Sequence, residues 1–206
     1  MKRLLRAVAL AVATAAGAVP AFAADAAALL HDRLKLAPVL AGEFEQTKTL
    51  KGFRNPLVSH GEFLVARGQG VWWHTLKPFE STLVVTKTRL FTRNADGSTS
   101  ELADAQAEPG VAQVNALIFS LLAVDPATLA DKFDVVAQAV GKDGWTLQLT
   151  PLDPSLARFV AHATLAGERD VQTVRLDEAR GDTTQIRFSH QQPAAALSAD
   201  EAARLR

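Results

Sequence analysis

Residues 60–87 read HGEFLVARGQGVWWHTLKPFESTLVVTK. Apolar runs of strand length alternate in this stretch with glycine, proline and charged residues that favour turns. Similar runs precede and follow it, so that the predicted strands cover residues 42–50, 60–67, 70–76, 81–87, 89–94, 133–140, 145–152, 157–166, 171–179 and 182–191. Short turns join antiparallel neighbours. The spacing therefore predicts about nine or ten strands in one antiparallel sheet, curved or partly closed.

The run WTLQLT at 145–150 indicates how such a sheet is oriented. Trp145, Leu147 and Leu149 alternate with polar residues. Because successive side chains of a strand point to opposite faces, this strand has one apolar face and one hydrated face. The predicted sheet therefore has one side that must be covered.

Helices are expected at few places. Residues 25–37, DAAALLHDRLKLA, predict one amphipathic helix that ends at Pro38. A short helix is predicted near residues 126–132. The tail LSADEAARLR predicts a terminal helix that is capped by Ser198.

The segment VAQVNALIFSLLAV at 111–124 contains no charged residue and is also predicted to be helical. A membrane span needs about 20 apolar residues, so this segment is too short to be one. It is either buried in an ordinary core or covers a surface that is itself apolar. The residue pattern leaves both alternatives open.

The first 23 residues have the organisation of a secretory signal peptide. A basic start, MKRLLR, precedes an uncharged run rich in alanine and valine, which ends in the small-residue pattern Ala21-Phe22-Ala23. We expect cleavage after Ala23, which predicts a periplasmic mature chain of residues 24–206 that forms a single domain. An uncleaved membrane anchor is the alternative, but the apolar run is short for one.

Composition argues against several classes of function. Without the three basic residues of the leader, the 22 basic residues fall to 19 against 22 acidic ones, so nothing predicts binding to nucleic acid. The sequence has no cysteine for disulfides, thiolate metal sites or a lipid anchor. Its five histidines are scattered, and neither a Gly-x-Ser-x-Gly elbow nor a calcium loop is present. We therefore expect no metal, no cofactor and no enzymatic activity.

Arg67 stands on the same strand face as Phe63 and Val65 in the run HGEFLVAR. An arginine in line with two core residues either reaches water at the rim of the sheet or points into a cavity. The spacing alone does not choose between these two positions.

Three motifs in residues 44–91 follow one another in a recognisable order. Phe44-Glu45-Gln46 is a Phe-x-Gln motif in the first strand, and Arg67 lies six residues before Trp73. A Trp … Pro … Leu-Val run then extends from Trp73 through Pro78 to Val84. After a signal peptide and one helix, this order resembles the periplasmic lipoprotein carriers of the LolA family. The order of elements extends the resemblance over most of residues 25–192.

The sequence also departs from that family. Gly68 replaces the proline that commonly follows the arginine, and Thr86-Lys87-Thr88 replaces an Asp-Gly hairpin. Thr92-Arg93-Asn94 stands where aromatic residues are usual, and a terminal helix replaces a longer extended tail. The resemblance is therefore to a divergent member, which could serve a dedicated lipid or pigment-export pathway.

The resemblance implies a mostly β fold with a helical lid, an α+β arrangement in which one curved antiparallel sheet forms a half-open, unclosed β-barrel over an apolar cavity. Such a cavity holds acyl chains. The helix at 111–124 would be the lid, and Arg67 the latch that holds it by hydrogen bonds to its backbone. The candidate cavity residues come from both halves of the chain: Phe63, Val65, Trp72, Trp73, Leu117, Ile118, Leu121, Leu122, Trp145 and Leu147.

By the same resemblance we expect a soluble periplasmic carrier, or chaperone, that shields acyl chains of lipoproteins or of another lipidated cargo during transfer from the inner to the outer membrane. Its partners would be the acylated cargo, an inner-membrane exporter and an outer-membrane acceptor, and it would act as a monomer. The alternatives are a lipid-binding receiver or sensor of the same fold and a scaffold that binds only proteins. A receiver is usually tethered through a lipidated N-terminal cysteine, which favours the carrier here.

The predicted leader can be tested directly. Protein recovered from the periplasm should begin at Ala24, because the A-x-A pattern places the cleavage site after Ala23. N-terminal sequencing checks this, and recovery of Met1 on membrane-bound protein would contradict it.

Overall fold

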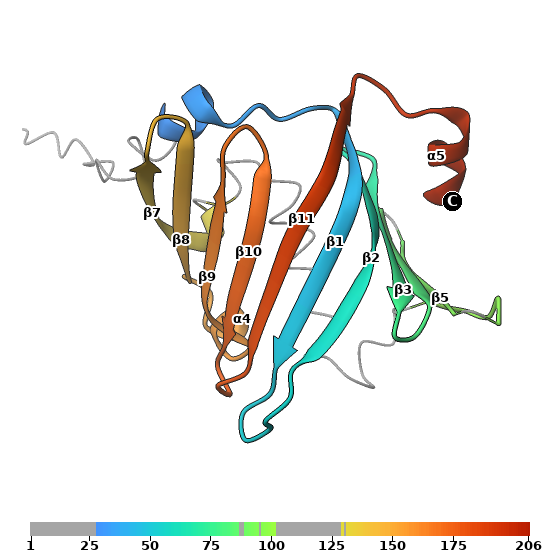
Figure 1. The fold of residues 1–206 in the computed structure, drawn as a ribbon, viewed down its shortest axis with the longest axis horizontal. Coiled ribbons are helices and arrows are strands. Elements are labelled where there is room, and N and C mark those ends of the chain that lie inside the picture. The colour runs from blue at the N-terminus through green and yellow to red at the C-terminus, as the bar shows by residue number, and fades with distance from the viewer. Residues whose placement is uncertain (1–27, 87–88, 95, 102–128, 130) are drawn as a thin grey trace, which may run out of the picture.

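The computed structural model describes residues 28–86, 89–94, 96–101, 129 and 131–206 (Figure 1). Its strands form a single sheet in the order β6-β5-β4-β3-β2-β1-β11-β10-β9-β8-β7. In chain order they are β1 (Val39–Thr49), β2 (Leu57–Ala66), β3 (Gly70–Lys77), β4 (Ser81–Thr86), β5 (Leu90–Asn94), β6 (Thr99–Glu101), β7 (Phe133–Val140), β8 (Gly144–Pro151), β9 (Val160–Gly167), β10 (Val171–Glu178) and β11 (Thr183–Ala194). All neighbours are antiparallel. Among the described residues no pairing joins β6 to β7, so the sheet is not closed.

The prediction of one antiparallel sheet is confirmed, with two differences in its elements. The short strand β6 was not predicted. Strand β9 begins later than predicted because helix α4 (Pro154–Ala157) occupies the residues before it. The Asp153 side chain caps this helix by accepting a hydrogen bond from the Ser155 backbone N–H at 2.8 Å.

The pairing of β1 with β11 joins the two halves of the sheet. Strands β1 to β6 and strands β7 to β11 each follow one another in chain order, and β1 lies beside β11 between them. This central pair runs from Val39 opposite Ala194 to Thr49 opposite Thr183, with one irregularity between Ala41 and Glu43. Figure 1 shows these two long strands crossing the middle of the curved sheet.

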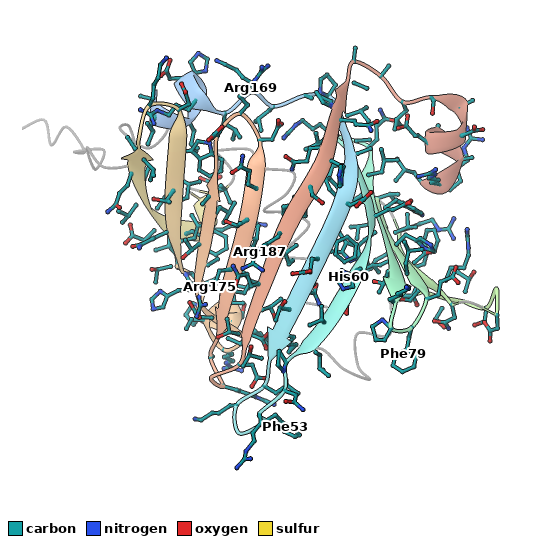
Figure 2. The ribbon with its side chains drawn as sticks, viewed as in Figure 1. Phe53, His60, Phe79, Arg169, Arg175 and Arg187 are labelled. Carbon is teal, nitrogen blue, oxygen red and sulfur yellow. The ribbon has the colours of Figure 1, made fainter. Side chains whose placement is uncertain are left out.

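The two faces of the sheet differ in composition. The inner face, defined here as the side of Phe44, Phe63 and Trp73, carries the larger cluster of buried apolar residues, which extends from β4 across to β7. The outer face is largely polar, and Arg187 and Arg175 lie on it in ion pairs with Glu45 and Asp177, respectively. Figure 2 shows both arginines, with Phe53 and Phe79 at hairpin tips. This alternation is the two-residue period that the sequence predicted.

A second, smaller apolar cluster lies on the outer face of β1 to β5. It contains Trp72 and Phe91, and the C-terminal residues Leu197 and Leu205 pack against it. Helix α5 (Ala199–Arg204) crosses this patch, and the Arg204 guanidinium lies 4.7 Å from the centre of the Trp72 ring. The aliphatic and cationic side chains of the tail therefore cover apolar surface that the strands leave exposed.

The predicted cap of α5 is confirmed. The Ser198 hydroxyl accepts a hydrogen bond from the Glu201 backbone N–H at 3.2 Å, and the Glu201 carboxylate accepts one from the Ser198 N–H at 2.8 Å. These two bonds form a capping box. The Ser198 backbone N–H and the Ser198 hydroxyl both donate to the Glu201 carboxylate and hold its pKa below its usual value.

The N-terminal strap, defined as residues 28–38, is helical only over residues 28–33. The predicted helix is therefore too long at its C-terminal end. The Leu34 N–H still bonds to the Leu30 carbonyl at 2.8 Å, but the Lys35 N–H bonds to the Arg169 carbonyl at 2.7 Å. The chain leaves the helix because the β9–β10 turn supplies this acceptor.

The predicted helix at 111–124 lies outside the described residues. Of the short helix predicted near 126–132, residues 129, 131 and 132 are described and are helical. A search of the described part of the chain finds no helix that is long and apolar enough to span a membrane.

The close approach of β2 to its neighbours predicts a large effect at Gly61. A Cβ atom at this position would lie 2.0 Å from the His74 carbonyl oxygen and 2.8 Å from the Phe44 ring. We expect Gly61→Ala to lower the free energy of unfolding by about 3 kcal/mol through overpacking. Urea denaturation measures this change, with Ser59→Ala on the same strand and face as the control. Equal stability of the two variants would show that the sheet absorbs the extra atom.

Candidate functional site

An aromatic cluster occupies the centre of the inner face. The rings of Phe44 and Trp73 are stacked, with centroids 3.8 Å apart. Phe63 and Phe188 meet edge to face at 5.1 Å, and Phe188 lies 6.2 Å from Trp73. Gly61 stands beside Phe44 in the sheet, and the absence of a side chain there leaves room for the Phe44 ring. These four rings give a continuous apolar surface across β11, β1, β2 and β3.

The second half of the inner face is mainly aliphatic. Leu147, Leu149 and Leu165 are fully buried on β8 and β9, and Trp145 lies at the strap end of β8. The Trp145 indole N–H donates to the Glu168 carbonyl in the β9–β10 turn at 2.5 Å. The polar atom of this ring is therefore satisfied at the edge of the sheet, while its apolar body faces inward.

The strap lies across one end of this apolar surface. Leu30 and Leu34 are buried in the inner cluster. The Arg33 guanidinium donates to the Gly144 carbonyl, at the start of β8. Together with the bond from Lys35 to Arg169, these contacts attach the strap to two hairpins at the same end of the sheet.

Arg67 attaches the strap to a third hairpin, the turn between β2 and β3. Its Nε donates to the Ala37 carbonyl at 2.9 Å, and its backbone N–H donates to the Pro38 carbonyl at 2.9 Å. The side chain is half-buried. Arg67 is therefore bonded to backbone at one end of the inner face rather than reaching freely into water.

A small pocket lies where the strap meets the sheet. Its lining includes Leu34, Phe63, Val65, Arg67 and Asp170. The cavity volume is about 20 Å³, which suffices for about one water molecule. Burial raises the pKa of the Asp170 carboxyl, and the positive charges of Arg169 and Arg67 act against this rise. The gap between strap and sheet at this point therefore admits little more than one water molecule.

Comparison with known proteins identifies this arrangement. Residues 36–201 match the family described as "Outer membrane lipoprotein carrier protein LolA". The chain belongs to the LolA family.

The chain is also similar to individual known proteins. A protein of Xanthomonas axonopodis pv. citri (strain 306) named "Outer-membrane lipoprotein carrier protein" is 29% identical over 163 residues, which are 78% of this chain and 75% of that protein. The crystal structure of MucB has a TM-score of 0.51 and 17% identity, over 88% of this chain and 62% of that chain, and so shares the fold. A LolA superfamily protein from Nitrosomonas europaea gives a TM-score of 0.47 and 11% identity, over 85% of this chain and 96% of that one.

In this LolA-family chain, five predicted cavity residues lie together on the inner face: Phe63, Val65, Trp73, Trp145 and Leu147. Trp72 does not join them, and its prediction is corrected here. It belongs to the outer cluster, since it is the strand neighbour of Trp73 and therefore points to the opposite face. The other four predicted residues, Leu117, Ile118, Leu121 and Leu122, lie outside the described residues.

The LolA family is a family of carriers rather than of enzymes. A search of the described part of the chain finds no group of three or more side chains able to hold a metal ion. His60, His74 and His190 lie on the outer face, where each pairs with a glutamate, and are therefore separated by the sheet from the apolar cluster of the inner face.

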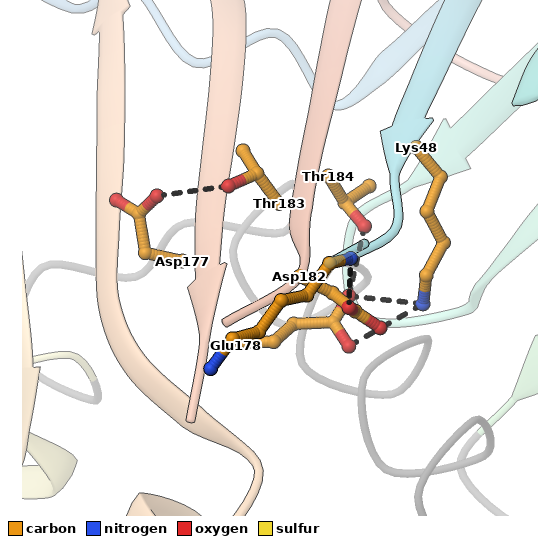
Figure 3. A network of polar contacts seen from close by, with 7 residues as sticks. Lys48, Asp177, Glu178, Asp182, Thr183 and Thr184 are labelled. Atoms are coloured by element: carbon orange, nitrogen blue, oxygen red, sulfur yellow. Dashed lines mark hydrogen bonds and ion pairs between the residues drawn. The ribbon is translucent and has the colours of Figure 1, made fainter. Parts of the chain in front are cut away.

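One feature of the inner face was missed in the sequence. The Lys48 ammonium lies 3.0 Å from a carboxylate oxygen of Glu178, and the Thr184 hydroxyl donates to the same oxygen at 3.0 Å (Figure 3). Both charged side chains are largely covered, with 29% and 13% of their side-chain surfaces exposed, respectively. The sequence does indicate that Lys48 lies on the inner face, because Phe44, Gln46 and Lys48 are spaced two residues apart in one strand and share the face of the buried Phe44.

The Arg67 contacts predict a functional phenotype. Arg67→Leu removes a charged donor, an interaction of about 1.5–3 kcal/mol. We expect an apolar probe bound to the inner face to dissociate about tenfold faster, since tenfold corresponds to about 1.4 kcal/mol, while the melting temperature falls by only a few degrees.

Stopped-flow dilution measures the dissociation rate, and calorimetry measures the melting temperature. Arg187→Leu, at an exposed outer-face position, is the matched control. An Arg67→Leu protein that melts many degrees early but releases the probe at the normal rate would mark Arg67 as a purely structural residue.

Proposed function

We propose that this protein is a soluble periplasmic carrier that shields the acyl chains of lipoproteins, or of another lipidated cargo, between the inner and outer membranes. The observation that carries the proposal is the inner face itself, a continuous surface of aromatic and aliphatic side chains on one side of an open sheet. Membership of the LolA family, whose description names a lipoprotein carrier, supports it.

The energetics favour such a surface for acyl chains. Each methylene group taken out of water contributes about 0.8 kcal/mol, so a long acyl chain needs roughly 10 kcal/mol of shielding. The stacked rings of Phe44 and Trp73 and the neighbouring aliphatic strands are of the right chemistry to supply it. In this proposal the unclosed sheet, with the helix at 111–124 as its lid, forms the half-open barrel around the cargo.

Release of cargo requires that the closed state be only a few kcal/mol more stable than the open one. The strap is held at its edges by a few hydrogen bonds, from Arg33, Lys35 and Arg67 to backbone carbonyls. Such bonds can be broken without unfolding the sheet beneath them. We therefore assign Arg67 the role of a latch that acts on the strap and on the proposed lid.

The partners follow from this role. An inner-membrane exporter would deliver the acylated cargo and an outer-membrane acceptor would receive it, and the carrier would travel between them as a monomer. The leader at residues 1–23 would direct the chain to the periplasm, and residues 24–206 would form the carrier domain. The competing function is a scaffold of the same fold, whose packed inner face binds no lipid.

The positions of Trp72 and Trp73 allow a direct test. Saturable binding of N-phenyl-1-naphthylamine should change tryptophan emission, because Trp73 lies on the inner face and Trp72 lies on the outer face under α5. We expect Trp73→Phe to reduce this change, with the remainder coming from Trp145 on the same face, and Trp72→Phe to keep it. Fluorescence titration of the two variants is the measurement.

Native mass spectrometry of protein purified from its own periplasm provides the second readout. A carrier should retain acyl-bearing ligands under these conditions. Protein that carries no such ligand and also fails to bind the probe would support the scaffold and refute the carrier.

A further inference from the structure

The inner face is not apolar over its whole length. Toward the ends of β1 and β2 that lie away from the strap, its residues become mainly polar, although Leu57 stands opposite Lys48. We call this region the polar band, and it consists of Gln46, Lys48, Ser59, Thr75, Glu178 and Thr184.

Strand register places these residues next to one another and on the inner face. Gln46 pairs with Ser59 across β1 and β2, and Lys48 pairs with Thr184 across β1 and β11. Gln46 follows Phe44 by two residues, so its side chain lies about 7 Å farther along the same face. The band therefore begins where the aromatic cluster ends.

The neutral members of the polar band have side-chain hydrogen-bond donors and acceptors that a ligand could use. Gln46, Ser59 and Thr75 are half-buried. Within the described residues, no hydrogen bond joins any of these three side chains to another protein group. One amide and two hydroxyls thus lie beside the aromatic cluster, on the same face, with donors and acceptors available to a ligand.

The charged members of the band neutralise each other. Both carboxylate oxygens of Glu178 lie within hydrogen-bonding distance of the Lys48 ammonium, at 3.0 and 3.3 Å. A second anion at Lys48 would be repelled by Glu178, and a cation at Glu178 would be repelled by Lys48. The band therefore suits a head group that forms hydrogen bonds but carries no net charge.

We propose that the polar band binds the uncharged, hydrogen-bonding linkage or head group of an acyl-chain amphiphile, such as a glycerol ester, whose chain lies on the aromatic cluster. This inference rests on the proposed function, because it names the ligand class of the same inner face. It predicts that the site distinguishes lipids with the same chain by their head groups.

The test compares three ligands that have a saturated sixteen-carbon chain but different heads. Monopalmitoylglycerol is neutral, palmitate is an anion and hexadecyltrimethylammonium is a cation. Displacement of N-phenyl-1-naphthylamine from the full-length mature chain, at pH 8 and below micelle-forming concentrations, gives their affinities. We expect monopalmitoylglycerol to bind about tenfold more tightly than either ion, as expected for one or two net hydrogen bonds.

The central variant is Gln46→Leu, with Gln185→Leu as its matched control. Gln185 lies on the neighbouring strand β11, but its side chain points to the outer face, opposite to Ile186 and Thr184. Gln46→Leu should weaken monopalmitoylglycerol binding about three- to tenfold and leave the naphthylamine unaffected. Gln185→Leu should change neither. If Gln46→Leu does not fold, Ser59→Ala replaces it.

A charge variant tests the balance between Lys48 and Glu178. Glu178→Gln leaves the Lys48 ammonium without its negative partner. Relative to monopalmitoylglycerol, this variant should therefore bind palmitate more tightly than the wild-type protein does. Equal affinities for the three ligands in the wild-type protein, or equal losses in Gln46→Leu and Gln185→Leu, would overturn the inference while leaving the carrier intact. Failure of the wild-type protein to bind even the naphthylamine would overturn both.

Discussion

The two-residue period of the β-strand, imposed on one uninterrupted sheet, is the constraint on which the rest of this structure depends. It sends Trp73 to the apolar side and its neighbour Trp72 to the opposite side, where the C-terminal helix covers it. Because the strands alternate in this way, a single layer of backbone separates a mainly apolar inner face from a largely polar outer face. The strap, α4 and α5 are short additions that protect what this layer leaves uncovered.

The residues that stabilise the sheet are also those of its proposed binding surface. Phe44 and Trp73 stabilise the sheet through their stacked rings, and in the proposed function the same rings are the surface that binds an acyl chain. The strap is attached to the sheet by a few hydrogen bonds, among them the bond from Arg67 to the Ala37 carbonyl. Segments attached in this way open at a lower free energy than paired central strands, so the proposed carrier would open at its rim while its central strands remain paired.

Much of the fold could be predicted from local patterns in the sequence. All ten predicted strands are present, and Ser198 caps the last helix, because alternation and capping depend on residues close in sequence. The end of the first helix could not be predicted, since it depends on the distant carbonyl of Arg169. Trp72 was predicted on the wrong face, because adjacent residues of a strand point to opposite faces and only one of the two tryptophans can lie on the inner face. The ion pair between Lys48 and Glu178 could not be predicted, since the two residues are far apart in the sequence.

The central position of β1 beside β11 has a consequence for how the chain acquires its structure. These strands are the first and the last of the sheet in sequence, yet they pair along most of their length. Closing so long a loop is entropically costly, so folding of this topology is slow and waits for the final strand. The central pairing of β1 with β11 therefore cannot form until the whole chain is present. Until then the apolar strands of each half of the sheet stay exposed, which makes the incomplete chain prone to aggregation.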